Sequence, residues 1–320
     1  MAVGIFWAVV TCLLWGWTFA ATMLIPGYSG ILVGLARELV IGTLAIGYYL
    51  WTRGKTFQFD ASDKRTALVL GAAGQIVQPI FFFLSTVYAG SLIAGVCYGF
   101  CPVLVSVISN WLQKRRGNPS MPVKRLVFPI SMVALGFIFC NFTEFKSVSE
   151  LTGSASDLAL GVCFGLTSTA LFTYYSIKNA EWMLAHKNAD SVAWFSIQCI
   201  VMFPVAIVLY AAASLYLQGS LLGAMPERFV LVMVCVGLFG SFLPGITYNM
   251  AASRIPTSLL GQLLVLETLF GVTTGQIVAW EVPGPLTLAG LACFLLGVVV
   301  SVRTFSNFEK ELEGAVPQAA

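Results

Sequence analysis

The chain has 320 residues, of which 58% are hydrophobic and only 10% are charged, with 17 Lys and Arg, 14 Asp and Glu and a single histidine. Average soluble domains carry about 25% charged residues, so this chain cannot cover a water-facing surface of ordinary size. With a mean hydropathy of +0.88, the composition excludes soluble enzymes, nucleic-acid binders and disordered proteins, and it indicates a polytopic membrane protein.

Ten apolar runs of membrane-spanning length follow one another along the chain. A transmembrane helix needs about 20 mostly apolar residues, and backbone polar groups in lipid must be paired within the segment, so we expect each run to be a helix. The first run lacks a basic leader and is expected to be a retained helix. The predicted spans are Val3–Leu24, Ile31–Trp51, Thr66–Tyr88, Leu92–Leu112, Val123–Phe142, Leu158–Ile177, Val192–Leu217, Phe229–Asn249, Thr257–Trp280 and Leu286–Val302.

Basic residues are distributed very unevenly between the two sides of these spans. If the N-terminus is cytoplasmic, the outer loops contain only Lys146 and Arg228, and Arg37 lies within a span. Because Lys and Arg are enriched in cytoplasmic loops, we expect both termini to be cytoplasmic. The basic residues on the inner side would be Arg53, Lys55, Lys64, Arg65, Lys114, Arg115, Arg116, Lys124, Arg125, Lys178, Lys187, Arg254, Arg303 and Lys310.

The two halves of the chain resemble each other weakly. An offset of 166 residues aligns the stretch 91–95 with 257–261, and it pairs glycines of the two halves: Gly71 with Gly237, Gly74 with Gly240 and Gly95 with Gly261. An odd number of spans per half would make the repeats inverted, as in many secondary transporters. We therefore predict an all-α integral membrane protein of ten transmembrane helices in two inverted five-helix repeats. The repeats would be residues 1–145 and 157–305, with an external loop at 146–156 and a cytoplasmic tail at 306–320.

Several short motifs carry a family resemblance over residues 1 to about 305. They are the segments 15–19 (Trp-Gly-Trp-Thr-Phe), 24–26 (Leu-Ile-Pro), 101–103 (Cys-Pro-Val), 255–269 and Glu281. In these segments the chain resembles the EamA-type drug/metabolite transporter superfamily, and most closely its YtfF-like bacterial inner-membrane group. The resemblance implies ten helices, a central cavity and export or exchange of small metabolites. One departure is that Thr268 follows Glu267, where the superfamily often has proline, so a proline kink is not assumed.

Three ionisable residues are predicted within the membrane, where charges are costly and usually functional. Glu267 lies near the middle of the ninth span and is a candidate for binding an amino-bearing substrate group or a proton; the alternative is a hydrogen-bonded structural carboxyl. Arg37 is a candidate ligand for a substrate carboxylate or phosphate. The alternatives for Arg37 are an ion pair with Glu267 and an extension toward the outer headgroups together with Glu38.

Polar and aromatic side chains of other spans are candidates to complete a substrate site. For Gln75 and Gln78, which share a helix face, the alternative is hydrogen bonding between helices. For the others the alternative is ordinary packing, and for the two tryptophans a packed interior would also satisfy the indole donors. These further candidates are Trp15, Trp17, Tyr98, Tyr174, Tyr248, Asn249 and Gln262.

Other chemistries find little support in the sequence. Eight cysteines fall in or at spans without a histidine beside them, so no metal site or disulfide framework is expected. His186 is predicted in an inner loop, no aspartate pair lies within a span, and there is no nucleotide-binding loop. We therefore expect no enzyme activity, cofactor or metal. The expected partners are the lipid bilayer and a small-molecule substrate, without nucleic acid, and a homodimer remains open.

The sequence therefore predicts a multi-pass protein of the bacterial inner (plasma) membrane that works as a secondary transporter. The carrier would export or exchange small metabolites by alternating access. Amino acids or related zwitterions would fit if Arg37 and Glu267 face one cavity. That cavity would be built from the first four spans of each repeat, with the fifth and tenth spans more peripheral. The alternative is a non-transporting structural or sensory membrane protein.

Overall fold

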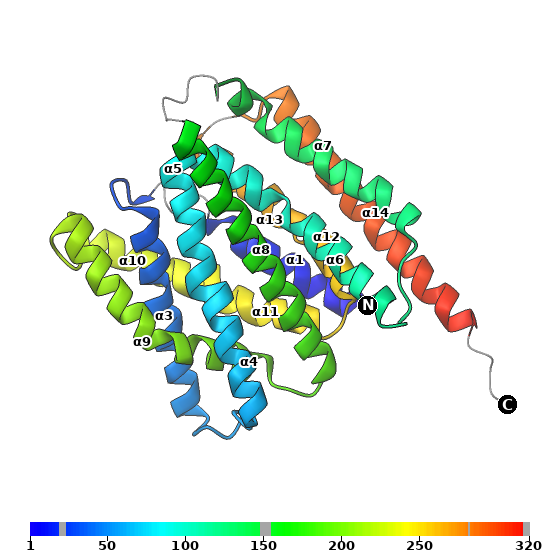
Figure 1. Ribbon diagram of the computed structural model, residues 1–320, viewed down its shortest axis with the longest axis horizontal. Helices are drawn as coiled ribbons and strands as arrows, with labels where there is room; N and C mark the ends of the chain where they lie inside the picture. The colour runs from blue at the N-terminus through cyan, green and yellow to red at the C-terminus, as the bar shows by residue number, and fades with distance from the viewer. Residues whose placement is uncertain (19–23, 148–154, 281, 316–320) are drawn as a thin grey trace.

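The computed structural model describes residues 1–18, 24–147, 155–280 and 282–315, and within these ranges the fold is entirely helical. Phe19, Glu281 and most of the predicted external loop lie outside the described residues. In chain order (Figure 1), the helices are α1 (Ala2–Gly16), α3 (Gly30–Trp51), α4 (Ala61–Gly71), η2 (Ala72–Val77), α5 (Gln78–Gly99), α6 (Cys101–Arg115), α7 (Val123–Ser147), α8 (Ala155–Ala185), α9 (Ser191–Gln218), α10 (Pro226–Gly237), η4 (Leu238–Phe242), α11 (Leu243–Ala252), α12 (Thr257–Leu263), α13 (Val265–Ala279) and α14 (Pro285–Ala315).

The helices reproduce the predicted spans. Among the described residues, nine helical runs are long and apolar enough to cross a membrane, and α1 is a further, shorter apolar helix. Each run overlaps one predicted span from the second to the tenth. The largest difference is in α14, which continues to Ala315, well past the predicted end at Val302. The prediction ends a span where the apolar run meets the membrane boundary. The helix itself can continue beyond that boundary into water. The chain is an integral membrane protein.

Two of the long spans contain a π-helical turn just before a proline. In the third span η2 ends at Val77 and Pro79 follows, and in the eighth η4 ends at Phe242 and Pro244 follows. Proline lacks an N–H and clashes with the carbonyl four residues earlier, and a wider turn relieves both constraints. The first residues of η2 and η4, Ala72 and Leu238, are separated by the same 166 residues that align the two halves.

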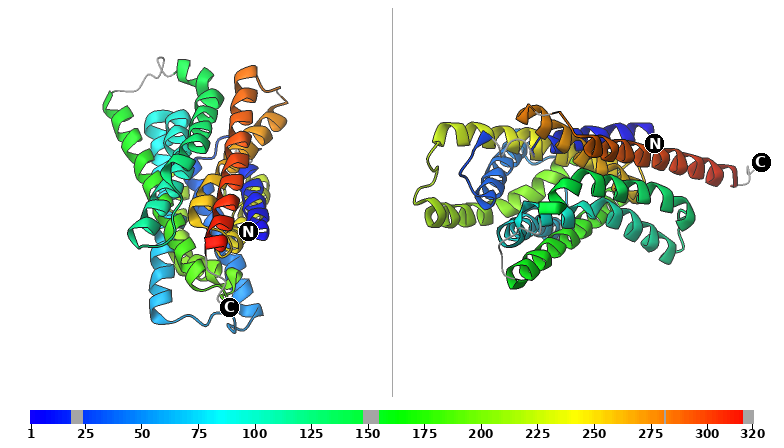
Figure 2. Two further views of the ribbon diagram at one scale, coloured as in Figure 1. Left: turned by 90° about the vertical axis from the view of Figure 1, so that its right-hand side faces the viewer. Right: turned by 90° about the horizontal axis from the view of Figure 1, so that it is seen from above.

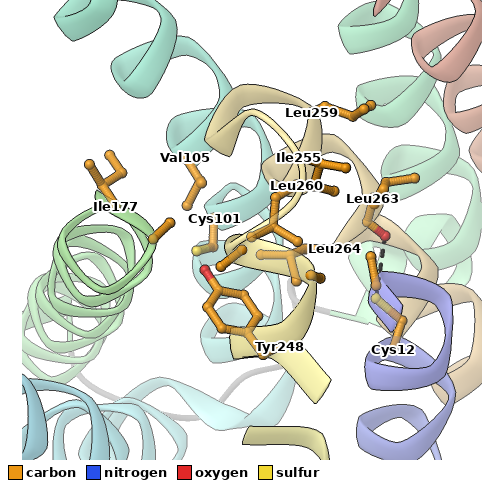
Figure 3. Packing of buried hydrophobic residues seen from close by; sticks show 14 of the residues in the cluster. Cys12, Cys101, Val105, Ile177, Tyr248, Ile255, Leu259, Leu260, Leu263 and Leu264 are labelled. Carbon is orange, nitrogen blue, oxygen red and sulfur yellow. Dashed lines mark hydrogen bonds between the residues drawn. The ribbon is translucent and has the colours of Figure 1, made fainter. Parts of the chain in front are cut away.

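The fourth and ninth spans are both interrupted near their middle. The fourth breaks at Phe100, between α5 and α6, and the ninth at Leu264, between α12 and α13. At the second break the Glu267 N–H donates to the Leu264 carbonyl rather than one residue further back. The Leu263 carbonyl instead accepts a hydrogen bond from the Cys12 thiol at 3.4 Å, as Figure 3 shows. The ninth span is therefore broken without a proline.

Helix packing pairs the spans of the first half with those of the second. α3 packs on α9, α6 on α12, and α7 on α14. α1 packs on α11 and α13, while α8 packs on α5 and α6. The α7–α14 pair lies along one side of the bundle, with α14 reaching outward at its C-terminal end (Figures 1 and 2). The interior is therefore enclosed by the remaining eight spans.

Candidate functional site

A cavity of about 130 Å³ lies between the two halves. Its walls come from the first four spans and from the sixth to the ninth, the same eight spans that the sequence assigned to a central cavity. Gln75, Ser241 and Glu267 lie close to the middle of their spans. The full lining is Trp15, Thr18, Arg37, Gly74, Gln75, Gln78, Tyr98, Phe172, Tyr175, Phe195, Gly240, Ser241, Gly245, Tyr248 and Glu267.

Arg37 and Glu267 both line this cavity, which answers the question that the sequence left open. They are not paired with each other. Arg37 Nη2 lies 2.5 Å from Glu38 Oε1, and the side chains of the pair are 24% and 2% exposed. Glu267 has no hydrogen-bond or ion-pair partner within the described ranges. Of the two charged side chains that line the cavity, only Glu267 is therefore uncompensated.

Further polar groups face the same space. Gln78 lines the cavity and also donates to Ser168 Oγ on α8 at 3.0 Å, so both of its predicted roles are present together. Gln75 lines the cavity as well. Ser241 Oγ and Arg37 Nε are buried and find no hydrogen-bond partner among the described residues. Since nearly all buried polar groups in native proteins are satisfied, such atoms indicate a position that a polar ligand or water fills.

Aromatic rings form much of the remaining wall. Phe172 lies at the centre, with its ring centroid 5.4 Å from that of Tyr98, 6.2 Å from Trp15 and 6.1 Å from Tyr175. Trp15 also lies 5.7 Å from Tyr248. Tyr248 bridges cavity and scaffold, because its hydroxyl donates to the Ser176 carbonyl at 3.2 Å. The site thus combines one free carboxyl with a cluster of π faces.

Four predicted site residues do not line the cavity. Asn249 and Gln262 are buried in hydrogen-bond networks between helices: Asn249 accepts from Asn179, and Gln262 donates to Ser106. Tyr174 is 43% exposed on the outer surface of α8, because its neighbour Tyr175 takes the inward direction. Trp17 packs against the cluster around α3 and α10. For Asn249, Gln262 and Trp17 the geometry supports packing rather than a substrate contact, and Tyr174 faces away from the cavity.

The sequence also missed residues that the cavity brings together. Phe172, Tyr175 and Phe195 are indistinguishable in an apolar run from side chains that face lipid. Thr18 follows the end of α1, and Ser241 is a small hydroxyl residue within an apolar run. The glycines at 74, 240 and 245 leave no signal of their own, since they line the space through their backbone. The repeat offset does place Gly74 on Gly240, which was the one available clue.

A second, smaller cavity of about 20 Å³ adjoins Glu267 on the side of the two interrupted spans. It lies between the residues around the break at Phe100 and those around the break at Leu264. Cys101 and Pro102 line it from the fourth span, and Glu267 and Thr268 from the ninth. These are equivalent positions under the repeat offset. Glu267 therefore faces both spaces, and the second is roomy enough for about one water molecule.

Comparison with known proteins supports an inner-membrane assignment. No family model matches the chain, so the wider superfamily remains an expectation from the motifs. The chain is 25% identical over its whole length to the inner membrane protein YtfF of Escherichia coli (strain K12), of which it also covers the full length. A solved structure titled only "Crystal structure of protein" has a TM-score of 0.75 at 16% identity, over 95% of this chain and 97% of that one. The chain is a multi-pass protein of the inner membrane, similar to YtfF over its whole length.

Proposed function

We propose that the protein is a secondary transporter that moves a small amino-bearing metabolite across the inner membrane by alternating access. The observation that carries the proposal is the cavity, whose lining holds the free Glu267 carboxyl and the unsatisfied atoms of Arg37 and Ser241. A carboxylate left without a partner inside a membrane protein is costly and marks a substrate or ion pathway. A structural role for Glu267 would instead require a partner from the protein.

The packing between halves supports two inverted repeats, residues 1–145 and 157–305. Replacing each span by its equivalent in the other half, five places away, turns the pairing α1–α11 into α8–α5. The same replacement turns α1–α13 into α8–α6. The pairings α3–α9, α6–α12 and α7–α14 map onto themselves. Repeats of this kind, with a central site and interrupted helices, are the architecture from which alternating access arises. We take export or exchange as the direction because the motif resemblance implies it.

Two other functions are less well supported. A structural or sensory subunit has no need of unsatisfied polar groups around an internal cavity. A membrane-embedded enzyme would need a nucleophile or metal, and no group of three metal-ligating side chains occurs in the part of the chain that the structure describes. We therefore propose that the protein has no catalytic activity.

The test is transport by the purified protein in liposomes that are loaded with a mixture of bacterial metabolites, with the released compounds identified by mass spectrometry. The wild-type protein should release particular amino-bearing compounds faster than protein-free liposomes, and Glu267→Gln should reduce that rate at least about tenfold, because it removes a charged hydrogen bond. Tyr174→Phe is the matched control, since Tyr174 lies away from the cavity. Equal release from wild-type and protein-free liposomes would favour a structural or sensory role.

Glu267 is also our candidate for proton coupling, since it faces both the main cavity and the water-sized space beside it. If the carboxyl exchanges a proton for the substrate, an imposed pH gradient should drive transport in the wild-type protein. In Glu267→Gln the same gradient should have no effect on the residual rate. Transport by the wild-type protein that ignores the gradient would remove proton coupling but leave the carrier itself intact.

A further inference from the structure

The ion pair between Arg37 and Glu38 lies within one helix at the edge of the cavity. The two residues are consecutive, so their side chains leave α3 about 100° apart. Arg37 reaches the cavity and is 24% exposed, whereas Glu38 is 2% exposed and does not line it. Glu38 thus acts on the cavity only through Arg37, whose charge it balances.

This pairing determines the charge that a substrate meets. Arg37, Glu38 and Glu267 together carry one net negative charge when all three are ionised. A substrate carboxylate would need Arg37 as its partner. If Arg37 turned toward it, Glu38 would remain buried and unpaired, which is the costliest arrangement of a charge inside a protein. A substrate ammonium group, by contrast, meets Glu267 without breaking any existing pair.

We infer that Glu38 is a specificity-determining positioning residue, and that the site selects small organic cations, amines without a free carboxylate, over zwitterions. This deepens the proposed function and rests on it. It also revises the zwitterion expectation, which assumed that Arg37 was free to bind the substrate.

The aromatic wall supports the same substrate class. Trp15, Tyr98 and Phe172 present ring faces or edges within one cluster beside Glu267. Cations are attracted to ring faces, most strongly where water is excluded. A carboxylate next to the same rings gains no such attraction. The carboxyl and the rings therefore favour the same sign of charge.

The test compares two probe pairs that differ by one carboxylate: leucinamide with leucine, and phenylalaninamide with phenylalanine. Binding is measured by calorimetry on the purified protein in detergent at mildly acidic pH, and transport by counterflow in liposomes with protein-free liposomes as the leak control. The wild-type protein should bind and carry the amides at least about tenfold better than the amino acids, the effect of one charged contact.

Three variants separate the roles of the charges. Glu38→Gln frees Arg37, and the amide preference should shrink about tenfold, with the amino acids gaining. Glu267→Gln leaves the Arg37–Glu38 pair in place, and both amides should lose binding. The double variant Arg37→Gln/Glu38→Gln restores the net negative charge, so it should recover the amide preference. This double variant also avoids an unpaired buried charge if Glu38→Gln alone fails to fold.

The outcomes distinguish this inference from the proposed function. The inference is overturned if the wild-type protein prefers the amino acids, or if it binds neither member of a pair while it carries other metabolites. Either result leaves the proposed carrier function intact. Unchanged selectivity in Glu38→Gln, or a double variant that does not recover the amide preference, overturns the role of Glu38. If the amides bind with the expected preference but are not transported, the inferred selectivity of the site is supported and the proposed carrier function is wrong.

Discussion

Several buried polar side chains in this protein bond to one another, and others face the cavity. Asn179 Oδ1 accepts from Trp194 Nε1 at 2.8 Å and from Gln198 Nε2 at 3.2 Å, and Asn179 Nδ2 donates to Asn249 Oδ1 at 2.7 Å. This network ties α8, α9 and α11 together. Hydrogen-bond networks between helices rigidify a core, whereas Glu267 and Ser241 are left available to a ligand.

We expect Asn179→Leu to destabilise the protein strongly. The substitution leaves the Trp194 indole N–H and the Asn249 amide oxygen without their partner, and Gln198 Nε2 keeps only its bond to the Trp194 carbonyl. Each unsatisfied buried group costs about 1–3 kcal/mol. Thermal unfolding of the purified protein in detergent, followed by intrinsic fluorescence, should show a transition several degrees lower. Asn118→Leu is the control. Asn118 is exposed in the connection between α6 and α7, and among the described residues its side chain bonds only to Gln113. Equal transitions in both variants would mean that the network adds little.

The charged residues of the candidate site were easier to predict from the sequence than its polar and aromatic residues. Glu267 and Arg37 were identified because ionisable residues within a span are rare enough to be conspicuous. Gln262 and Gln75 look alike in the sequence, yet Gln262 bonds to Ser106 and Ser301 while Gln75 lines the cavity. The direction of a side chain depends on the rotation of its helix, and a helix that is apolar all round gives no periodicity from which to infer it.

At the scale of helices, close approach between spans depends on particular glycines. A methyl group added at Gly161 of α8 would lie 2.3 Å from the Ala89 Cβ on α5, and one at Gly165 would lie 2.8 Å from Ser85 Oγ. Without a hydrophobic force between helices in lipid, such backbone proximity carries much of the packing. By contrast, a methyl group at Gly275 would meet no atom of the described residues within 4 Å.

Gly161→Ala and Gly275→Ala therefore form a matched pair. Alanine favours a helix over glycine by about 1 kcal/mol at both positions. At Gly161 overpacking against α5 should outweigh that gain and destabilise the protein by about 1–3 kcal/mol. The check is the fraction that stays monodisperse in size-exclusion chromatography after heating. We expect Gly161→Ala to lose monodisperse protein at a lower temperature than wild type. Gly275→Ala should lose it at the same temperature as wild type or a higher one, and the opposite order of the two variants would contradict the packing argument.

The helices themselves were largely predictable from the sequence, but their irregularities were not. The length of an apolar run sets where a span lies, so the second to the tenth spans were placed within a few residues, apart from the extended ends. The π-helical turns before Pro79 and Pro244 depend on tertiary packing, which the sequence does not show. The break at Leu264 follows no proline or glycine, and the Cys12 thiol that satisfies the freed carbonyl comes from a distant part of the chain.

For the whole molecule, the inverted repeats and the orientation make one combined prediction. Asn118 lies in the connection between α6 and α7, and Gly284 precedes α14; both are exposed and they are separated by the repeat offset of 166 residues. In inverted repeats, equivalent positions face opposite sides of the membrane. The basic residues around Asn118, among them Arg115 and Arg116, place that connection in the cytoplasm by the positive-inside rule. Gly284 should then face outward.

Asn118→Cys and Gly284→Cys test this with a membrane-impermeant maleimide applied to spheroplasts. Gly284→Cys should react with the maleimide before lysis, while Asn118→Cys should react only afterwards. Labelling of the unsubstituted protein is subtracted to correct for its native cysteines. The reverse order would invert the orientation but keep the repeats antiparallel, since equivalent positions would still face opposite sides. Reaction of both cysteines from the same side would remove the inverted repeats, and with them the symmetry on which alternating access about the central cavity depends.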